Sequence, residues 1–289
     1  MESSPLISIG LPIALFIIMI GIGLTLTARD FGQVTLNPKG MIMGTLAQIV
    51  FMPLAAMAIA LLLGLSPAIA VGLVIIAACP GGTVSNLFVM LAKGHVALSI
   101  LLTVSASLIT IVTLPFFANF ALQMYYGEGT DIVLPVGKTI AMLLVIVLLP
   151  VVLGMIIRAR FPAPARKVEG WVGIFGGLVL GFLVISQLIS LGDRLPGLLA
   201  QAGPAAILLN LVGFAGGAMV SRLVGLPREQ ALAIGVELGI KNVTIALMVT
   251  LTLLKSSDMS IPSVAYSLLM FGFGFLVIAT GRKLVPATS

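Results

Sequence analysis

Long apolar stretches separated by short connections dominate the pattern of residues along this chain. A helix needs about 20 mainly apolar residues to cross the hydrocarbon core of a bilayer, and nine stretches reach about that length. They cover residues 6–26, 41–63, 67–91, 96–123, 133–157, 170–189, 204–224, 230–254 and 262–281. The connections are rich in Gly, Pro and Asn, which favour turns. The pattern predicts an all-α polytopic membrane protein with nine transmembrane helices, in which residues 1–289 form a single transmembrane domain.

The composition agrees with this prediction and narrows the possible functions. Hydrophobic residues make up 60% of the 289 positions, charged residues make up only 8%, and the mean hydropathy is +1.26. A soluble domain carries roughly 25% charged residues, so this chain has too few of them to cover a surface in water. The same numbers exclude an intrinsically disordered chain and a catalytic domain outside the membrane.

Basic residues fall mainly on one side of the predicted spans. If the N-terminus is outside, eleven Lys and Arg residues lie in one set of connections, and only Lys138, Arg194 and Lys255 lie in the other. Cytoplasmic loops carry such an excess, so we expect a cytoplasmic C-terminus. This distribution explains the net charge of +6 without a nucleic-acid partner. Because the first span follows Glu2 and no basic leader, we expect a membrane span there and not a cleaved signal peptide.

The third span, about 67–91, is interrupted by the sequence Cys-Pro-Gly-Gly-Thr-Val-Ser-Asn at residues 79–86. Pro80 removes a backbone donor, and the two glycines after it disfavour an immediate return to helix. Unwound backbone at membrane depth is tolerated only where protein or a water-filled cavity surrounds it. A simple kink would need Pro80 alone, whereas this motif adds polar side chains. We therefore interpret the interruption as a functional break.

The eighth span, about 230–254, contains both an acid, Glu237, and a base, Lys241. Charged side chains near the bilayer centre are costly and usually mark a substrate or ion path. The alternative is a structural ion pair, since residues four apart face each other on a continuous helix, although such pairs often add little stability. The third and eighth spans cross in opposite directions. Two inverted repeats with broken helices meeting at a midplane site would produce this arrangement.

Side chains that carry oxygen lie near both breaks and suit a coupling cation. Glu237 is the only acidic residue deep in a predicted span, and Ser85 and Asn86 follow the first break. Ser99 and Thr103 lie four apart on the fourth span and therefore share one helix face. Sodium in transporters binds such oxygens together with exposed carbonyls at helix ends. We interpret these five residues as a candidate sodium site and expect no other cofactor.

The residues beside the breaks also suit an anionic substrate group. Half-helices that begin at a break direct their N–H groups toward it, and Thr83 and Asn242 add side-chain donors. Enzymatic chemistry has less support. A hydrolase built on Ser85 and Lys241 lacks a recognisable oxyanion hole, the single His95 cannot form a zinc cluster, and no nucleotide-binding motif is present. The pattern therefore favours a transporter over an enzyme.

At these residues the sequence resembles the bile acid:sodium symporter family, and the likeness covers essentially the whole chain. The most specific segments are 79–86 and the Glu-Leu-Gly-Ile-Lys-Asn sequence at 237–242, supported by 21–26 and by Gln48 with Met52-Pro53. The resemblance implies a nine-helix form with a panel domain and a core domain. It implies two crossed broken helices in the core, substrate between the domains, and a bacterial inner membrane as the location.

The resemblance also implies a second sodium site, where this chain departs from the family pattern. That site would use Glu237, Gln48, carbonyls near Leu238 and Ile240, and a glutamine at the position that is Lys241 here. An ammonium group at this position would repel a second cation. In one interpretation Lys241 permanently replaces the second sodium, and in the other it releases a proton during transport. We favour the first.

Together these features predict a secondary transporter of small or amphipathic organic anions, of the bile acid, pantoate or keto acid class. It would work by alternating access, coupled to one sodium ion. The alternative within transport is a sodium-independent carrier, either proton-coupled or facilitative. An ion channel is the alternative from another class, and it is disfavoured because the polar residues cluster at mid-membrane between apolar ends. The lipid bilayer is the expected surrounding, and no obligate protein partner is expected.

Overall fold

The computed structural model describes residues 10–27, 38–82, 84–127 and 132–284, and helices make up almost all of them. In chain order the α-helices are α1 (Leu11–Thr25), α3 (Pro38–Leu46), α4 (Met52–Leu62), α5 (Pro67–Ala78), α6 (Ser85–Leu91), α7 (Val96–Tyr126), α8 (Val136–Leu143), α9 (Leu149–Arg160), α10 (Pro162–Leu191), α11 (Leu195–Val224), α12 (Arg228–Gly239), α13 (Val243–Leu247) and α14 (Ile261–Leu284). Three π-helical segments, η3 (Ala47–Phe51), η4 (Leu144–Leu148) and η6 (Met248–Leu253), continue α3, α8 and α13. Two short 3₁₀ turns, η5 (Gly192–Arg194) and η7 (Asp258–Ser260), precede α11 and α14.

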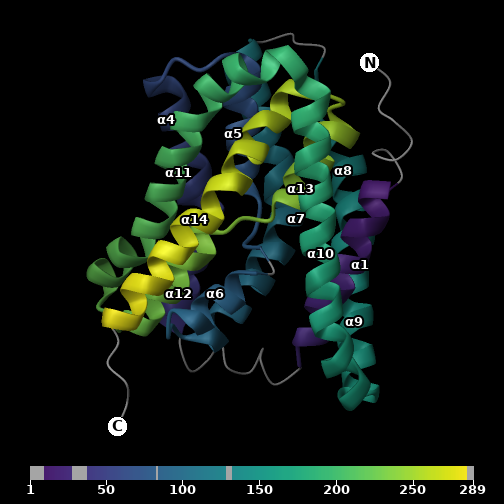
Figure 1. The fold of residues 1–289 in the computed structure, drawn as a ribbon, viewed down its shortest axis with the longest axis vertical. Coiled ribbons are helices and arrows are strands. Elements are labelled where there is room, and N and C mark those ends of the chain that lie inside the picture. Colours follow the sequence, from purple (N-terminus) through teal and green to yellow (C-terminus); the bar gives the residue numbers. More distant parts are fainter. Residues whose placement is uncertain (1–9, 28–37, 83, 128–131, 285–289) are drawn as a thin grey trace.

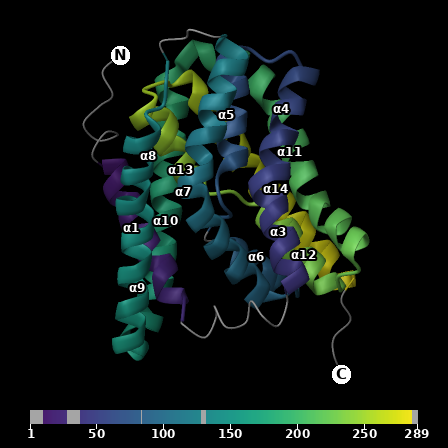
Figure 2. The same cartoon turned by 180° about the vertical axis from the view of Figure 1, so that it is seen from behind.

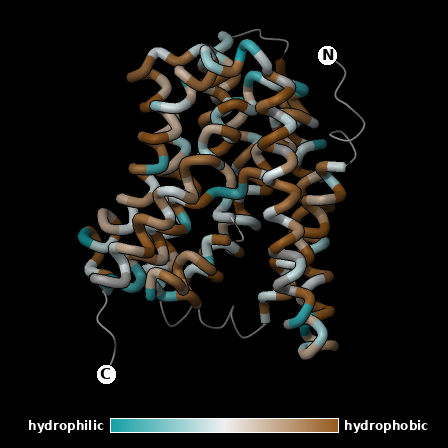
Figure 3. Tube along the Cα trace, in the orientation of Figure 1, coloured by the Kyte–Doolittle hydropathy of each residue, from teal (hydrophilic) through white to brown (hydrophobic). Residues whose placement is uncertain are grey.

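Five helical stretches are long and apolar enough to cross a membrane by themselves. They are Pro38–Leu62, Val96–Tyr126, Val136–Arg160, Gly192–Val224 and Asp258–Gly281. Figure 3 shows apolar residues along most of the helical surface, with hydrophilic residues gathered near the helix ends. The protein is therefore a helical integral membrane protein, as its hydropathy pattern predicted.

Two helices are longer than the apolar pattern predicted. α10 begins at Pro162 and not near residue 170, and α11 begins at Leu195 and not at 204. α11 therefore carries Pro204 in its interior, where proline is uncommon because it lacks an N–H donor. The predicted start at 204 was wrong because Pro204 lies inside this helix and does not begin it.

The third and eighth predicted spans are each divided into two helices. α5 ends at Ala78 and α6 begins at Ser85, while α12 ends at Gly239 and α13 begins at Val243. The two interruptions lie side by side, joined by an antiparallel bridge between Gly81 and Lys241. We call residues 79–82 and 240–242 together the crossing. Figures 1 and 2 place these links in the middle of the molecule, away from either end of the helices.

Each break supplies hydrogen-bond partners for the other. The Gly82 N–H donates to the Ile240 carbonyl at 2.8 Å, and the Asn242 N–H donates to the Pro80 carbonyl at 2.9 Å. Water is absent from the hydrocarbon core, so backbone groups freed by a break need protein partners. The two breaks therefore stabilise each other, and neither is expected to keep this conformation alone.

The helices pack in two groups. α1 packs against α9 and α10, and Figures 1 and 2 show these three helices together on one side of the molecule. The other group surrounds the crossing, with α11 packed on α12 and α14, and α5 packed on α7 and α4. α11 approaches α12 closely because Gly213 and Gly217 face it. A Cβ built on Gly213 would lie 2.8 Å from the Leu238 carbonyl oxygen.

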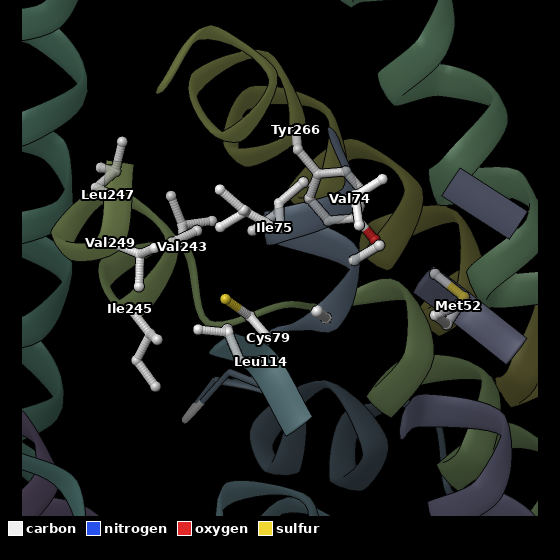
Figure 4. Close-up of a cluster of buried hydrophobic side chains, with 14 of the residues drawn as sticks. Met52, Val74, Ile75, Cys79, Leu114, Val243, Ile245, Leu247, Val249 and Tyr266 are labelled. Atoms are coloured by element: carbon white, nitrogen blue, oxygen red, sulfur yellow. The ribbon is translucent and has the colours of Figure 1, made fainter. Parts of the chain in front are cut away.

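Apolar side chains enclose the crossing on one side. Figure 4 shows Cys79 among Leu114, Val243 and Ile245, and Cys79 has no exposed surface. Cys79 therefore acts as a small packing residue beside Pro80. In Figure 3 the link between α12 and α13 stands out as a short hydrophilic stretch in the middle of an apolar molecule. Polar chemistry at mid-depth is thus concentrated at the crossing.

Candidate functional site

Glu237 lies near the end of α12, is completely buried, and accepts hydrogen bonds from three hydroxyl groups. The Ser85 hydroxyl donates to Oε1, and the Ser99 hydroxyl donates to the same oxygen at 2.5 Å. The Thr103 hydroxyl lies 2.9 Å from both Oε1 and Oε2. The carboxylate therefore connects three helices, α12, α6 and α7.

Local structure explains how the partners of Glu237 reach it. Ser85 is the first residue of α6, immediately after the break. Ser99 and Thr103 occupy successive turns on the same face of α7, as their spacing predicted. The Ser99 hydroxyl oxygen also lies 2.8 Å from Asn86 Oδ1, so its single proton is shared between Asn86 and Glu237. The structure thus brings together all five residues of the predicted cation site. We call them the Glu237 cluster.

The Glu237 cluster has the composition that a sodium ion requires. It offers a carboxylate, an amide oxygen and three hydroxyl oxygens, and it lies beside backbone carbonyls of the crossing. A hydroxyl has one donor and two acceptor lone pairs. The same Ser and Thr groups that donate to Glu237 can turn their lone pairs toward a cation that sits beside the carboxylate. The residues present therefore fit a bound monovalent cation.

Lys241 is also buried, with 1% of its surface exposed, but it does not pair with Glu237 as a continuous helix would require. α12 ends at Gly239, which turns Lys241 into the crossing, and its Nζ donates to the Cys79 carbonyl oxygen at 3.1 Å. Arg194 and Asp258, by contrast, do form an ion pair, near the molecular surface. The structure therefore does not support the alternative in which Glu237 and Lys241 form a structural ion pair.

The residues assigned to the altered second site also lie at the crossing. Leu238 and Ile240 are fully buried, and the Ile240 carbonyl is engaged by Gly82. Gln48, in the π-helical segment η3, is fully buried, and neither atom of its amide group has a hydrogen-bond partner among the residues that the structure describes. Buried amides without partners are rare, and each one needs an explanation. An unmatched amide beside the crossing is consistent with a ligand group at this position.

Of the two predicted substrate-binding residues, the structure describes only Asn242. Thr83 lies outside the described residues. Asn242 caps the start of α13, because its Oδ1 accepts from the Ile245 N–H at 3.2 Å, and 6% of its surface is exposed. Its Nδ2 makes no hydrogen bond within the described part of the chain. Asn242 therefore combines a structural role through its oxygen with a donor that remains available.

Sequence reasoning missed Tyr266, which completes the crossing. This fully buried residue of α14 donates its hydroxyl to the Gly239 carbonyl at 2.9 Å, at the point where α12 ends. Gly81 was noted only as a helix breaker, yet a Cβ built on it would clash with Oε2 of Glu237. A tyrosine inside an apolar span was the available signal for the first residue, because a buried hydroxyl usually needs a partner.

Replacing Tyr266 with phenylalanine should destabilise the protein by about 1–2 kcal/mol, because it leaves the buried Gly239 carbonyl without its donor. Thermal unfolding of the purified protein in detergent measures this effect. Tyr126→Phe is the matched control, since Tyr126 is 38% exposed at the end of α7. Equal effects of the two substitutions would contradict the role given to Tyr266.

Comparison with known proteins relates the chain to a family of sodium-dependent transporters. The profile of the sodium bile acid symporter family matches residues 12–195. An uncharacterized sodium-dependent transporter of Bacillus subtilis, YocS, is 34% identical over 82% of this chain and 72% of its own length. A probable chloroplastic sodium/metabolite cotransporter of Arabidopsis thaliana is 27% identical over 95% of this chain and 67% of its own length. Human sodium/bile acid cotransporter 4 is 31% identical over 80% of this chain, which spans about half of that longer protein.

Proposed function

The chain belongs to the sodium bile acid symporter family, and we propose that it transports small or amphipathic organic anions across a membrane, coupled to one sodium ion. The proposal includes bile acids, pantoate and keto acids as substrate classes, since two of the three relatives above are named only as sodium-dependent or metabolite transporters. The observation that carries it is the convergence of the five oxygen-bearing residues of the Glu237 cluster at the crossing of two broken helices.

The coupling follows from where the cluster residues are anchored. Ser85 and Asn86 start the half-helix after the first break, and Glu237 ends the half-helix before the second. A sodium ion held among them would neutralise the buried carboxylate and order both sides of the crossing. Asn242, and Thr83 outside the described residues, would then present donors to the anionic group of the substrate. Cation and anion would in this way stabilise the same conformation.

We further propose that the two packing groups of helices are the moving parts. α1, α9 and α10 would form a panel domain, and the helices around the crossing would form a core domain, with nine membrane spans in total. Alternating access would rock one group against the other around the crossing. The distribution of basic residues supports an outside N-terminus and a cytoplasmic C-terminus, and the compact chain and its family resemblance support a bacterial inner membrane as the location.

Lys241 is proposed to replace a second sodium ion as a fixed positive charge. Its Nζ donates to the Cys79 carbonyl at the crossing, and the unmatched amide of Gln48, which belongs to the proposed second site, lies beside Gly81 of the same crossing. A permanently bound ammonium there would exclude a second cation by repulsion, because two like charges in a medium of low dielectric repel strongly. One sodium would therefore bind per transport cycle.

Sodium, compared with potassium at equal ionic strength, should raise the thermal stability of the native protein. A ligand that binds only the folded state stabilises it by about 2.7 kcal/mol at a concentration 100 times its Kd. Lys241→Gln should strengthen this response and make it steeper with sodium concentration, because removal of the ammonium opens a second cation position. Thermal unfolding across a sodium titration measures both effects.

Lys138→Gln provides the control, since this lysine lies on α8 away from the crossing. It should leave the sodium response unchanged. An unchanged sodium response in Lys241→Gln would disprove the surrogate role of Lys241. If sodium and potassium stabilise the native protein equally, the chain is a sodium-independent carrier, either proton-coupled or facilitative.

A further inference from the structure

Among the side chains that the structure describes, the buried charges sum to zero. Among the described residues, Glu237 and Lys241 are the only charged side chains that are buried. Each is held by its own partners, since Glu237 accepts from hydroxyl groups and Lys241 donates to the Cys79 carbonyl. In their ordinary ionised forms they carry −1 and +1. The two charges lie on the same interrupted span, so the crossing and the Glu237 cluster taken together are electrically neutral when no ion is bound.

This charge balance determines which occupied states of the carrier can reorient between the two sides of the membrane. A charge at the bilayer centre is costly, whereas a neutral assembly is not. If sodium bound alone, the total charge of the crossing and the Glu237 cluster would be +1. If a monovalent anion bound alone, the total charge would be −1. With both ions bound the sum returns to zero. The two forms of low energy are therefore the empty carrier and the carrier that holds one sodium and one monovalent anion.

We propose that Lys241 enforces the coupling between sodium and substrate: its fixed charge prevents sodium from crossing without an anion and makes the transport of a monovalent anion electroneutral. The inference rests on the proposed function, because it requires a sodium ion at the Glu237 cluster. It assigns to Lys241 a role beyond exclusion of a second cation. The lysine determines which occupied states are permitted to reorient.

Removal of this charge should uncouple sodium from the substrate. In Lys241→Met, the Glu237 carboxylate and one sodium ion would form a neutral pair. The carrier could then reorient and release sodium on the other side with no anion bound. The methionine side chain keeps most of the apolar length of lysine and adds no amide ligand. Lys241→Arg is the matched control, because it retains a positive charge in the same position.

The experiment measures efflux of radioactive sodium from proteoliposomes in the absence of any organic anion, with unlabelled sodium outside. The native protein and Lys241→Arg should remain near the rate of protein-free liposomes. Lys241→Met should exceed the native rate on the order of 100-fold, the factor that corresponds to the roughly 2.5–3.5 kcal/mol cost of a central membrane charge. The double variant Glu237→Gln with Lys241→Met should lose the leak, because it lacks the carboxylate that binds sodium.

Two results would overturn the inference. One is anion-independent sodium efflux through the native protein at the rate of Lys241→Met, and the other is a Lys241→Met protein that still binds sodium but does not leak. Lys241→Leu is the second charge-free variant if the methionine protein does not fold. Failure of the proposed function has a different signature, because the native protein would then show no sodium-specific stabilisation in detergent.

Discussion

Replacing Glu237 with alanine is expected to abolish sodium-specific stabilisation and sodium-driven uptake. Glu237 is the only acidic side chain buried among the described residues, and three hydroxyl groups converge on it. Alanine removes the charge that attracts the cation and the acceptor that the three hydroxyls share, although Ser99 keeps Asn86 Oδ1 and Thr103 keeps the Ser99 carbonyl as acceptors. The full ligand-linked stabilisation, about 2.7 kcal/mol at 100 times Kd, should disappear. Thermal unfolding in sodium and in potassium measures the loss directly.

Two further variants separate charge from packing at this position. Glu237→Gln preserves the shape and can still accept hydrogen bonds from the cluster, but it carries no charge, so it should also lose the sodium response. Glu229→Ala removes the other carboxylate of α12, in its first turn and only partly exposed, and should keep the response. A persistent sodium response in Glu237→Ala would show that the cation binds elsewhere.

Gly81→Ala, which adds a single methyl group, is expected to affect the sodium response about as strongly as Glu237→Ala. A Cβ at Gly81 would clash with Oε2 of Glu237 and lie 3.3 Å from Nε2 of Gln48. Neither side chain has room to withdraw, since both are fully buried. Overpacking of this kind costs about 1–3 kcal/mol, and displacement of the carboxylate should remove sodium-specific stabilisation as well.

Gly203→Ala is the control for this substitution. A Cβ at Gly203 meets nothing within 4 Å, and the residue lies inside α11. Alanine there should leave the sodium response intact and should stabilise the helix slightly, by about 0.5–1 kcal/mol, because glycine is the poorer helix former. Normal sodium binding by a folded Gly81→Ala protein would contradict the close packing at the crossing.

The residues of the Glu237 cluster were predictable because each has a strong local signal. A carboxylate, a proline or an amide stands out in a chain that is 60% hydrophobic. The four-residue spacing of Ser99 and Thr103 on a continuous helix also predicted correctly that they share a face. Where the local conformation was regular, periodicity was enough to group the residues.

The same periodicity failed for Lys241 because the helix does not continue. Spacing alone pairs it with Glu237, but α12 ends at Gly239 and the ammonium group reaches the Cys79 carbonyl on another span. The partner lies 162 residues away in the sequence. The sequence did not predict the Tyr266 hydrogen bond or the close contact at Gly81 for the same reason. Both depend on segments that meet only after the chain has packed.

The sequence by itself determined that this chain is a helical membrane protein with interrupted spans and a polar site between the interruptions. Those features depend on local properties, namely apolar length, helix breakers and isolated polar residues, which act within a few turns of helix. Only the tertiary structure decided which backbone and side-chain groups satisfy one another at the crossing. In a membrane interior every freed polar group needs a partner, and that partner is chosen by packing between distant segments.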